Sequence, residues 1–522
     1  MSEPTQMPDI LTLHARTQPE KIAVIEDRPK DGLVARWTFD ELNRQANRLG
    51  NALIQLGIRP RDKIVWCGLN SPGLVRVMHA ARKIGATAVP LNYRLTPEEA
   101  TYVVDNCDAV LVYVDREHCS LFEKIRAQLP EVRHYLVFEG EATNGFEDAE
   151  ALVARASDAE PQVARSTEQA ATMIYTSGTT GHPKGALRRG ADPEATRRLV
   201  AEVGYVPNDI YLTTGPLYHS GPGGFMVLAH ALSNTVVVQR KFDAEDWLRL
   251  VEKYRVTTTF SAPTPIRLVC NLPAEVKSRY DCRSMKRMLA NAAPWSFALK
   301  EMYLRDFPED SLWEIYGSTE LGVDTILRPD DQRRKPGSCG RPAPGVEIAL
   351  FDDEGNEITA ANQPGELYVR SSTVFDTYYK AEEKYEKGRR GQFHSVGDVA
   401  YRDDEGYYYI CDRKNDMIIS GGMNIYPAEI EAALEHHPAI VDVAVFGIPS
   451  DEWGESVHAV VVGAGQKLTQ EDVIAFAREH LAGYKIPRSV SFMDEIPRTG
   501  SGKILKRVLR EPFWKGRGSR VN

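Results

Sequence analysis

A run of glycine and hydroxyl residues directly after an apolar segment is the feature that most constrains this chain. Residues 171–175 predict a strand, and the sequence then reads Thr-Ser-Gly-Thr-Thr-Gly-His-Pro-Lys-Gly over residues 176–185. Glycines allow backbone N–H groups to converge on an anion, hydroxyls add donors, and the lysine adds a positive charge. The segment therefore predicts a phosphate-binding loop. Its expected contacts are Thr176, Ser177, Gly178, Thr179, Thr180, Gly181 and Lys184.

Two other interpretations of this loop are available. A Walker A loop requires Gly-Lys followed by Ser or Thr at the start of a helix, and residues 176–185 lack that pattern. A surface turn also uses Ser, Thr and Gly, so a turn without a ligand is the structural alternative. The density of hydroxyls before the Pro-Lys pair favours an anion site.

The flanking sequence predicts an α/β fold. Residues 37–53 show helical spacing of apolar side chains after a Thr or Asp cap, and residues 73–84 predict a second helix between short strands at 63–68 and 87–90. The alternation continues with a strand at 109–114.

The C-terminal region predicts a compact α+β unit of its own. A chain of 522 residues exceeds the usual size of one domain. We expect a large domain over residues 1–413 and a small domain over residues 414–522. The small domain is predicted from strands at 441–446 and 458–462 and helices at 427–436 and 469–481.

Composition excludes several classes of function. The formal net charge is −9, which gives no general attraction to nucleic acid. The seven cysteines form no Cys-x-x-Cys pair, so neither a zinc site nor a disulfide framework is predicted. The N-terminal residues lack a basic and then apolar signal, and no apolar stretch is long enough to span a bilayer. We expect a cytoplasmic protein without stable membrane insertion.

The segment at 176–185 resembles the signature of the adenylate-forming superfamily, which comprises acyl-CoA synthetases, luciferases and peptide-synthetase adenylation domains. Further motifs that resemble this superfamily follow in its order at residues 216–221, 292–294, 316–320, 340–342, 397–398, 412–413, 417–431 and 497–503. The resemblance covers nearly the whole chain and is closest to a bacterial-type fatty-acid or other acid:CoA ligase. It implies a large N-terminal lobe of α/β layers with a β-barrel-like portion, and a small mobile C-terminal domain.

The resemblance also implies an ATP site. Glu320 suits Mg²⁺ chemically, because Mg²⁺ accepts a single carboxylate together with phosphate oxygens, and Thr176 is the second implied metal contact. Asp398 and Arg413 are implied ribose contacts. The implied adenine and phosphate contacts are Ala292, Ala293, Pro294, Tyr316, Gly317, Ser318 and Thr319. On residue type alone, Tyr316 would be core and Asp398 a turn residue.

The C-terminal motifs imply a second set of contacts. Lys503, otherwise a solvated lysine, is implied to serve only adenylation, because the small domain then swings about a hinge at Asn415. Coenzyme A is implied to pass Ser420, Gly421, Gly422 and Trp453, although a tryptophan in such a segment can equally belong to the core. His219 is implied to stand between the carboxylate site and the thiol tunnel, where a structural histidine is the alternative.

The predicted reaction has two steps. A carboxylate attacks ATP to give acyl-AMP and pyrophosphate, and the CoA thiol then displaces AMP. Small residues at Gly221, Gly223 and Gly224 indicate an open pocket for an extended chain or a ring system. We expect a medium or long fatty acid as the substrate. Aryl and alicyclic acids, transfer to a carrier protein in trans, and reduction or oxidation of the acyl-AMP remain alternatives. A homodimer is compatible with the resemblance, and a non-enzymatic nucleotide-binding protein would be expected to lack Lys503, Glu320 or Asp398.

Overall fold

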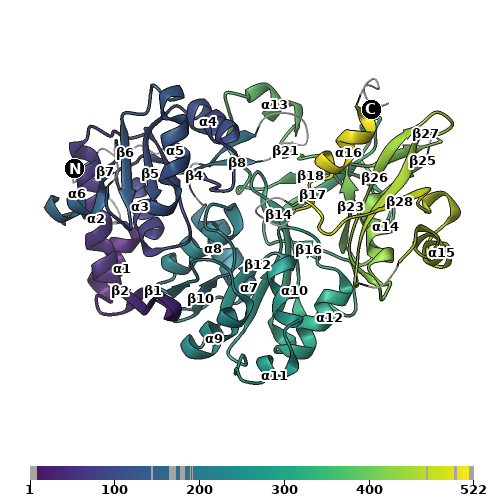
Figure 1. Cartoon of the computed structure of the whole chain (residues 1–522), viewed down its shortest axis with the longest axis horizontal. Coiled ribbons are helices and arrows are strands. Elements are labelled where there is room, and N and C mark those ends of the chain that lie inside the picture. The colour runs from purple at the N-terminus through teal and green to yellow at the C-terminus, as the bar shows by residue number, and fades with distance from the viewer. Residues whose placement is uncertain are drawn as a thin grey trace.

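The residues that the structure describes form four β-sheets, and the last of them belongs to a separate C-terminal unit at one end of the molecule (Figure 1). The computed structural model describes residues 9–142, 145–163, 172–176, 183–188, 190, 192–414, 416–421, 423–465, 468–498 and 503–515. In Figure 1 the purple and blue N-terminal segment lies opposite the yellow-green C-terminal unit. Within the described part of the chain, no helix combines the length and apolar character needed to cross a membrane.

An eight-stranded sheet contains the strands on both sides of the predicted phosphate loop. Its order is β19 (Thr377–Tyr379), β9 (Lys184–Arg188), β8 (Thr172–Thr176), β4 (Thr87–Leu91), β3 (Lys63–Cys67), β5 (Ala109–Asp115), β6 (His134–Phe138) and β7 (Glu147–Asp148). The strands from β8 to β7 are parallel, whereas β9 pairs antiparallel with both β8 and β19. The accompanying helices are α2 (Phe39–Gln55), α3 (Pro72–Lys83), α4 (Pro97–Asn106), α5 (Cys119–Ile125) and α6 (Ala149–Arg155).

A nine-stranded sheet forms the second layer. Its order is β16 (Arg341–Pro342), β15 (Gly322–Leu327), β14 (Leu312–Ser318), β13 (Arg287–Ala290), β12 (Thr258–Ser261), β10 (Ile210–Thr213), β11 (Thr235–Val238), β1 (Ile22–Arg28) and β2 (Leu33–Thr38). Its helices are α1 (Ile10–Thr17), α7 (Pro193–Val203), α8 (Ser220–Ala231), α9 (Ala244–Tyr254), α10 (Pro263–Cys270), α11 (Ala274–Lys277) and α12 (Phe297–Asp306). One buried apolar cluster contains residues of α2, α3 and α8, and it joins the two sheets through their helices.

The two remaining sheets flank the predicted hinge. The third is antiparallel and consists of β20 (Arg389–Arg390), β21 (Phe393–His394), β18 (Gly365–Arg370), β22 (Asp398–Arg402) and β23 (Tyr408–Arg413), with β17 (Glu347–Phe351) paired to β18 and α13 (Glu382–Lys387) nearby in sequence. The C-terminal sheet consists of β25 (Met423–Ile425), β24 (Ile418–Ser420), β27 (Gly454–Gly463), β26 (Ile440–Ser450) and β28 (Ser489–Phe492). Its helices are α14 (Pro427–Leu434), α15 (Gln470–His480) and α16 (Lys506–Trp514). We propose that the domain boundary lies directly after Arg413, where β23 ends.

Local sequence signals account for several helix ends. The expected helix at 37–53 is α2, and Thr38 caps it in a reciprocal capping box with Glu41. Thr469 and Asp472 form the same motif at the start of α15. The expected strand–helix–strand alternation from residue 63 to residue 114 is confirmed by β3, α3, β4 and β5.

A chain of hydrogen bonds between buried histidines fixes α8 against α3. The Arg82 guanidinium donates to Nδ1 of His79 at 2.9 Å, Nε2 of His79 lies 2.9 Å from Nδ1 of His230, and Nε2 of His230 lies 3.1 Å from the Ala23 carbonyl oxygen. Because arginine can only donate, Nδ1 of His79 must accept, and the proton of this ring lies on Nε2. Nε2 of His79 then donates to Nδ1 of His230, whose own proton also lies on Nε2, so both rings are neutral. Burial lowers the pKa of His230 from 6.5 to about 4 and lowers the pKa of His79 as well.

These hydrogen-bonded histidines predict that the folded protein loses stability in mild acid. The unfolded state binds protons on both histidines below pH 6.5, whereas the folded state keeps His230 neutral until about pH 4. The neutral histidines contribute fully to the free energy of unfolding above pH 6.5. Below that pH, this contribution falls by up to about 1.4 kcal/mol per histidine for each pH unit, until about pH 4. The free energy of unfolding, measured with urea at pH 7.5 and at pH 5.0, should differ less between the two pH values in His230→Gln than in the wild type. Equal pH dependence would contradict the assignment.

Candidate active site

Glu320 is the centre of a hydrogen-bonded cluster built from two sheets. It follows β14 and is buried, with 8% of its surface exposed. Its Oε1 accepts hydrogen bonds from the Thr176 hydroxyl at 2.8 Å and from the Tyr378 hydroxyl at 2.9 Å. Thr176 is the last residue of β8, so the start of the predicted phosphate loop is held directly against the carboxylate.

A lysine on the far side of the predicted loop completes this cluster. Lys184 begins β9, and its Nζ lies 5.0 Å from the centre of the Tyr378 ring. Burial lowers the pKa of Lys184, as does the nearby charge of Lys384, whereas Glu320 raises it. The other expected loop contacts, Ser177 to Gly181, lie outside the described residues. Thr176 and Lys184 therefore place both ends of the loop next to Glu320.

Asp398 and Arg413 lie together at one end of the third sheet, as neighbours on paired strands. Oδ2 of Asp398 accepts a hydrogen bond from the Tyr316 hydroxyl at 2.6 Å, and Nε of Arg413 lies 3.4 Å from Oδ1. Burial raises the pKa of Tyr316, and the Asp398 charge raises it further, so the phenol stays a donor. The structure thus joins the expected adenine residue to the expected ribose carboxylate.

The segment expected to flank adenine lies next to Tyr316. It follows β13, and Ala292 adopts a left-handed backbone with φ of 69°, a conformation that costs energy in a residue other than glycine. Nδ2 of Asn291 donates to the Ile315 carbonyl oxygen at 2.6 Å, which ties this turn to β14. Gly317 and Ser318 end β14, and Ala293 and Pro294 continue the turn.

Lys503 reaches this group from the C-terminal unit. It retains solvent exposure, and its ammonium interacts electrostatically with Arg413, Asp398 and Glu320. Partial enclosure by protein lowers the pKa of Lys503, as does Arg413, whereas the two carboxylates raise it. Groups from the large sheets and from the C-terminal unit therefore converge around Glu320.

His219 lies one residue before α8 and packs on its neighbour. Its ring centre is 4.3 Å from that of Tyr218. Ser220, the first residue of α8, forms a hydroxyl pair with Thr319 at 2.8 Å. The start of α8 is therefore fixed to the turn at residues 319–321, the Glu320 turn, and His219 lies next to this contact.

The segment expected to contact coenzyme A brings Gly421 against Trp453. The Gly421 N–H donates to the Trp453 carbonyl oxygen at 2.8 Å, and a Cβ atom on Gly421 would lie 2.8 Å from the indole ring. Gly421 also has φ of 58°, which favours glycine. Trp453 is 43% exposed, so it is not a core tryptophan. Ser420 ends β24 beside this pair, whereas Gly422 and the expected hinge residue Asn415 lie outside the described residues.

The expectation of an open pocket along the glycines of α8 is only partly met. A Cβ atom on Gly221 would overlap the Phe260 ring, and one on Gly223 would lie 2.6 Å from the Leu217 carbonyl oxygen. Only Gly224, among these three, faces open space. Gly221 is therefore small because Phe260 packs on it, which sequence spacing does not reveal.

Arg188 and Tyr378 contact the residues around Glu320 although no sequence pattern indicated them. Arg188 on β9 donates hydrogen bonds to the carbonyl oxygens of Thr319 and Thr373, the latter at 2.5 Å. No short pattern in the sequence singled out this arginine. Tyr378 carried no signal, because its approach to Glu320 depends on the pairing of β19 with β9.

The donor set of this site fits Mg²⁺ held jointly with phosphate. Among the described residues, no three His, Cys, Asp or Glu side chains converge as a metal cage. Glu320 instead offers one carboxylate beside the hydroxyl of Thr176. Mg²⁺ is commonly bound by one or two carboxylates together with substrate phosphates and water, so the residues present suit that ion.

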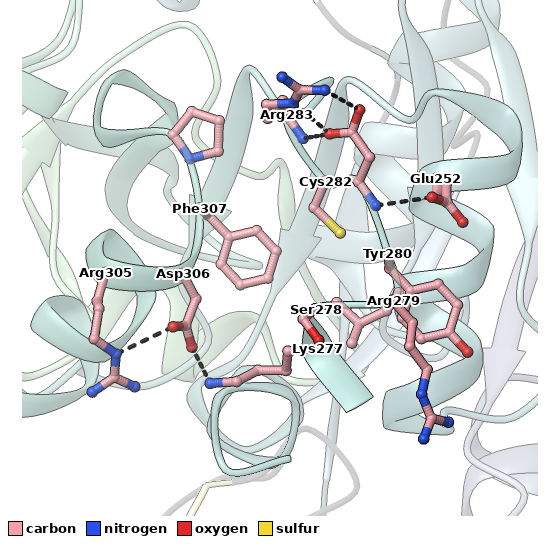
Figure 2. A pocket seen from close by; sticks show the side chains of 13 residues that line it. Glu252, Lys277, Ser278, Arg279, Tyr280, Cys282, Arg283, Arg305, Asp306 and Phe307 are labelled. Atoms are coloured by element: carbon pink, nitrogen blue, oxygen red, sulfur yellow. Dashed lines mark hydrogen bonds and ion pairs between the residues drawn. The ribbon is translucent and has the colours of Figure 1, made fainter. Parts of the chain in front are cut away.

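A separate surface hollow of about 810 Å³ contains none of these residues. It is lined by parts of α9, by residues 277–283 and by residues 305–308. Figure 2 shows Lys277 and Arg305 both directed to Asp306, and Arg283 forms hydrogen bonds with Asp281. The hollow is thus distinct from the Glu320 site.

Comparison with known proteins gives a consistent assignment. Residues 11–379 match the family model of the AMP-binding enzyme, and residues 429–503 match that of the AMP-binding enzyme C-terminal domain. The chain is 35% identical to a feruloyl-CoA synthase of Amycolatopsis sp over 91% of this chain and 94% of that protein. It is 31% identical to a long-chain-fatty-acid–CoA ligase of Mycobacterium tuberculosis over 92% and 93% of the two chains.

A solved structure extends the likeness to three dimensions. The anthranilate CoA ligase in complex with anthranoyl-AMP superposes with a TM-score of 0.86, at 26% identity and with 97% and 96% of the two chains covered. The motif order, the Glu320 cluster and the two matching family models agree. The chain belongs to the AMP-binding enzyme family, the adenylate-forming superfamily, and is of its acid:CoA ligase type.

Proposed function

We propose that this ligase forms an acyl-adenylate and then an acyl-CoA thioester at the Glu320 site. The observation that carries the proposal is geometric: Oε1 of Glu320 accepts hydrogen bonds from Thr176 and Tyr378. Beside this cluster, Asp398 is joined to Tyr316 and Arg413, and the charges of Lys184 and Lys503 act on the same carboxylates. Adenylation concentrates negative charge on phosphate and carboxylate oxygens, and fixed donors and cations stabilise such charge best in a site with little water. These groups supply that stabilisation.

Each residue has a proposed role. Asp398 accepts hydrogen bonds from the ribose, with Arg413 beside it, and Tyr316 lies flat on the adenine. Lys184 and Lys503 attract the phosphate and carboxylate oxygens, and Thr176 donates its hydroxyl. Mg²⁺ bound with Glu320 would neutralise phosphate charge. The Gly421–Trp453 pair contacts coenzyme A, and His219 closes the passage from the thiol to the carboxylate.

For the acid, an aryl carboxylic acid is our first candidate and a fatty acid the second. Phe260 occupies the space beside Gly221, and the ring centres of Phe260 and Phe225 are 5.5 Å apart in a stacked arrangement. Gly221 follows Ser220, whose hydroxyl forms a hydrogen bond with that of Thr319, so the buried Phe225–Phe260 stack packs close to the Glu320 cluster. Flat rings favour offset stacking with other flat rings. The open face at Gly224 supports the fatty-acid alternative, because it leaves room for an extended chain.

The test is acid-dependent ATP–pyrophosphate exchange with aryl, fatty and alicyclic acids, each measured with and without CoA. Exchange without CoA, together with CoA-dependent formation of a thioester, would support the two-step reaction. Exchange with no CoA stimulation would move the acceptor to a carrier protein or another nucleophile. Higher kcat/KM for a long fatty acid than for every aryl acid would overturn our first candidate.

We also predict that Arg188 acts on adenylation through the Glu320 turn. Each of its two charged hydrogen bonds stabilises the contact by about 1.5–3 kcal/mol. Their loss would leave the carbonyl oxygens of Thr319 and Thr373 without these donors. Arg188→Ala should therefore lower ATP–pyrophosphate exchange by about 10-fold or more and raise the apparent KM for ATP, with partial rescue by Arg188→Lys. Steady-state kinetics with ATP varied checks this, and circular dichroism verifies folding. An unchanged KM for ATP in a folded Arg188→Ala protein would contradict it.

A further inference from the structure

Arg267 connects the large N-terminal part of the molecule to the C-terminal unit at a place remote in sequence from the proposed hinge. It lies on α10, a helix of the nine-stranded sheet layer. Its Nη1 donates to the Val441 carbonyl oxygen at 3.1 Å, and its Nη2 lies 3.9 Å from Oε1 of Glu435. Val441 belongs to β26 and Glu435 caps the C-terminal end of α14, so both partners belong to the C-terminal unit.

The strand that Arg267 contacts is joined to the segment that carries Lys503. Asp442 follows Val441, and both of its carboxylate oxygens accept hydrogen bonds from Nη2 of Arg498, at 2.7 and 2.8 Å. Arg498 forms an isolated antiparallel bridge with Ile504, the residue after Lys503. The Leu505 N–H also donates to the Pro497 carbonyl oxygen at 2.8 Å. Contacts therefore run from Arg267 to both sides of the lysine segment.

We propose that Arg267 is a positioning residue that holds the C-terminal unit in the orientation in which Lys503 reaches the Glu320 site. The inference rests on the proposed two-step function. One acceptor of Arg267 is the main-chain carbonyl of Val441, whose position is fixed by β26. The hydrogen bond therefore depends on where β26 lies and not only on the position of the Glu435 side chain. Arg267 and Glu435 keep 30% and 23% of their side-chain surfaces exposed, so water can replace the contact when the orientation changes.

A second ion pair near the proposed hinge differs in position. Nζ of Lys506 lies 3.9 Å from Oδ2 of Asp412 and 2.9 Å from Oε1 of Glu431. Lys506 and Glu431 both belong to the C-terminal unit and Asp412 adjoins the proposed boundary, so these contacts do not join the C-terminal unit to the nine-stranded sheet layer. Arg267 lies on α10 and contacts Val441 and Glu435 across that junction, so a change in relative orientation separates it from them. Arg267 is therefore the better candidate for selecting one orientation.

The test separates the two half-reactions in the full-length enzyme. We expect Arg267→Gln to lower single-turnover acyl-AMP formation by roughly 10-fold, because a charged donor to the C-terminal unit is lost. Thioester formation from supplied acyl-AMP and CoA should stay at or above the wild-type rate, and Arg267→Lys should recover part of the adenylation rate. The matched control is Arg279→Gln, an exposed arginine whose partner Glu245 lies in the same part of the fold. Equal losses in both half-reactions, or no loss in either, would overturn the proposal.

Hydrogen exchange provides a measurement that does not depend on catalysis. In Arg267→Gln, peptides covering residues 435–442 and 497–505 should exchange faster than in the wild type and in Arg279→Gln. If the wild type adenylates no acid, the proposed function fails, whereas the exchange pattern still tests the contact. Unchanged exchange in both peptides would overturn the positioning role even in an active enzyme.

Discussion

Lys503→Ala is expected to abolish acyl-AMP formation while sparing the thioester step. Lys503 carries positive charge from the C-terminal unit toward Arg413, Asp398 and Glu320. Removal of one donor that stabilises developing charge typically costs about 10²–10³-fold in rate. The second half-reaction begins from acyl-AMP, whose pyrophosphate has already left, so the ammonium has less charge to stabilise there.

Two rates measured on one preparation check this expectation. ATP–pyrophosphate exchange reports adenylation, and conversion of supplied acyl-AMP with CoA reports thioester formation. Lys30→Ala is the matched control, because the Lys30 side chain is 85% exposed and its partner is Asp243. A comparable loss of both rates in Lys503→Ala would refute the assignment of this lysine to adenylation alone.

Sequence patterns predicted the parts of this fold that depend on near neighbours in the chain. The helix at 37–53 was predictable because its capping pair, Thr38 and Glu41, lies within one turn. The same holds for β3, α3 and β4, where apolar spacing and length decide the element. Thr176 and Lys184 were predicted as phosphate contacts because one short segment contains the chemistry that a phosphate needs, and that role stays a prediction.

Contacts set by sheet pairing could not be predicted in the same way. Tyr378 reaches Glu320 because β19 pairs with β9 in a register that places it opposite Ala186. Phe260 fills the space beside Gly221 because β12 packs against α8. Both depend on long-range packing, which a single sequence does not encode in any short pattern. For the same reason, the glycines of α8 suggested a wider pocket than the structure contains.

Glu320→Gln is expected to impair the use of Mg²⁺ without disturbing the fold. The amide oxygen can still accept the hydrogen bonds from Thr176 and Tyr378, so the buried cluster keeps its hydrogen bonds. The negative charge is lost, and a neutral amide is a poor ligand for a hard divalent cation. Changes in residues that only support a metal ligand cost about 10–100-fold in affinity or activity, so loss of the ligand itself should cost about 100-fold or more in ATP–pyrophosphate exchange.

A magnesium titration of exchange, together with calorimetry of ATP binding with and without Mg²⁺, checks this prediction. In Glu320→Gln the difference between ATP and Mg·ATP affinity should shrink, whereas Glu301→Gln, an exposed glutamate paired with Arg333, should behave as the wild type. Tyr378→Phe removes one hydrogen bond from the carboxylate but keeps its charge, so it should cost only about 10-fold. Wild-type dependence on Mg²⁺ in Glu320→Gln would show that the ion is held elsewhere. A larger loss in Tyr378→Phe than in Glu320→Gln would mean that the phenol, and not the carboxylate charge, carries the function of this cluster.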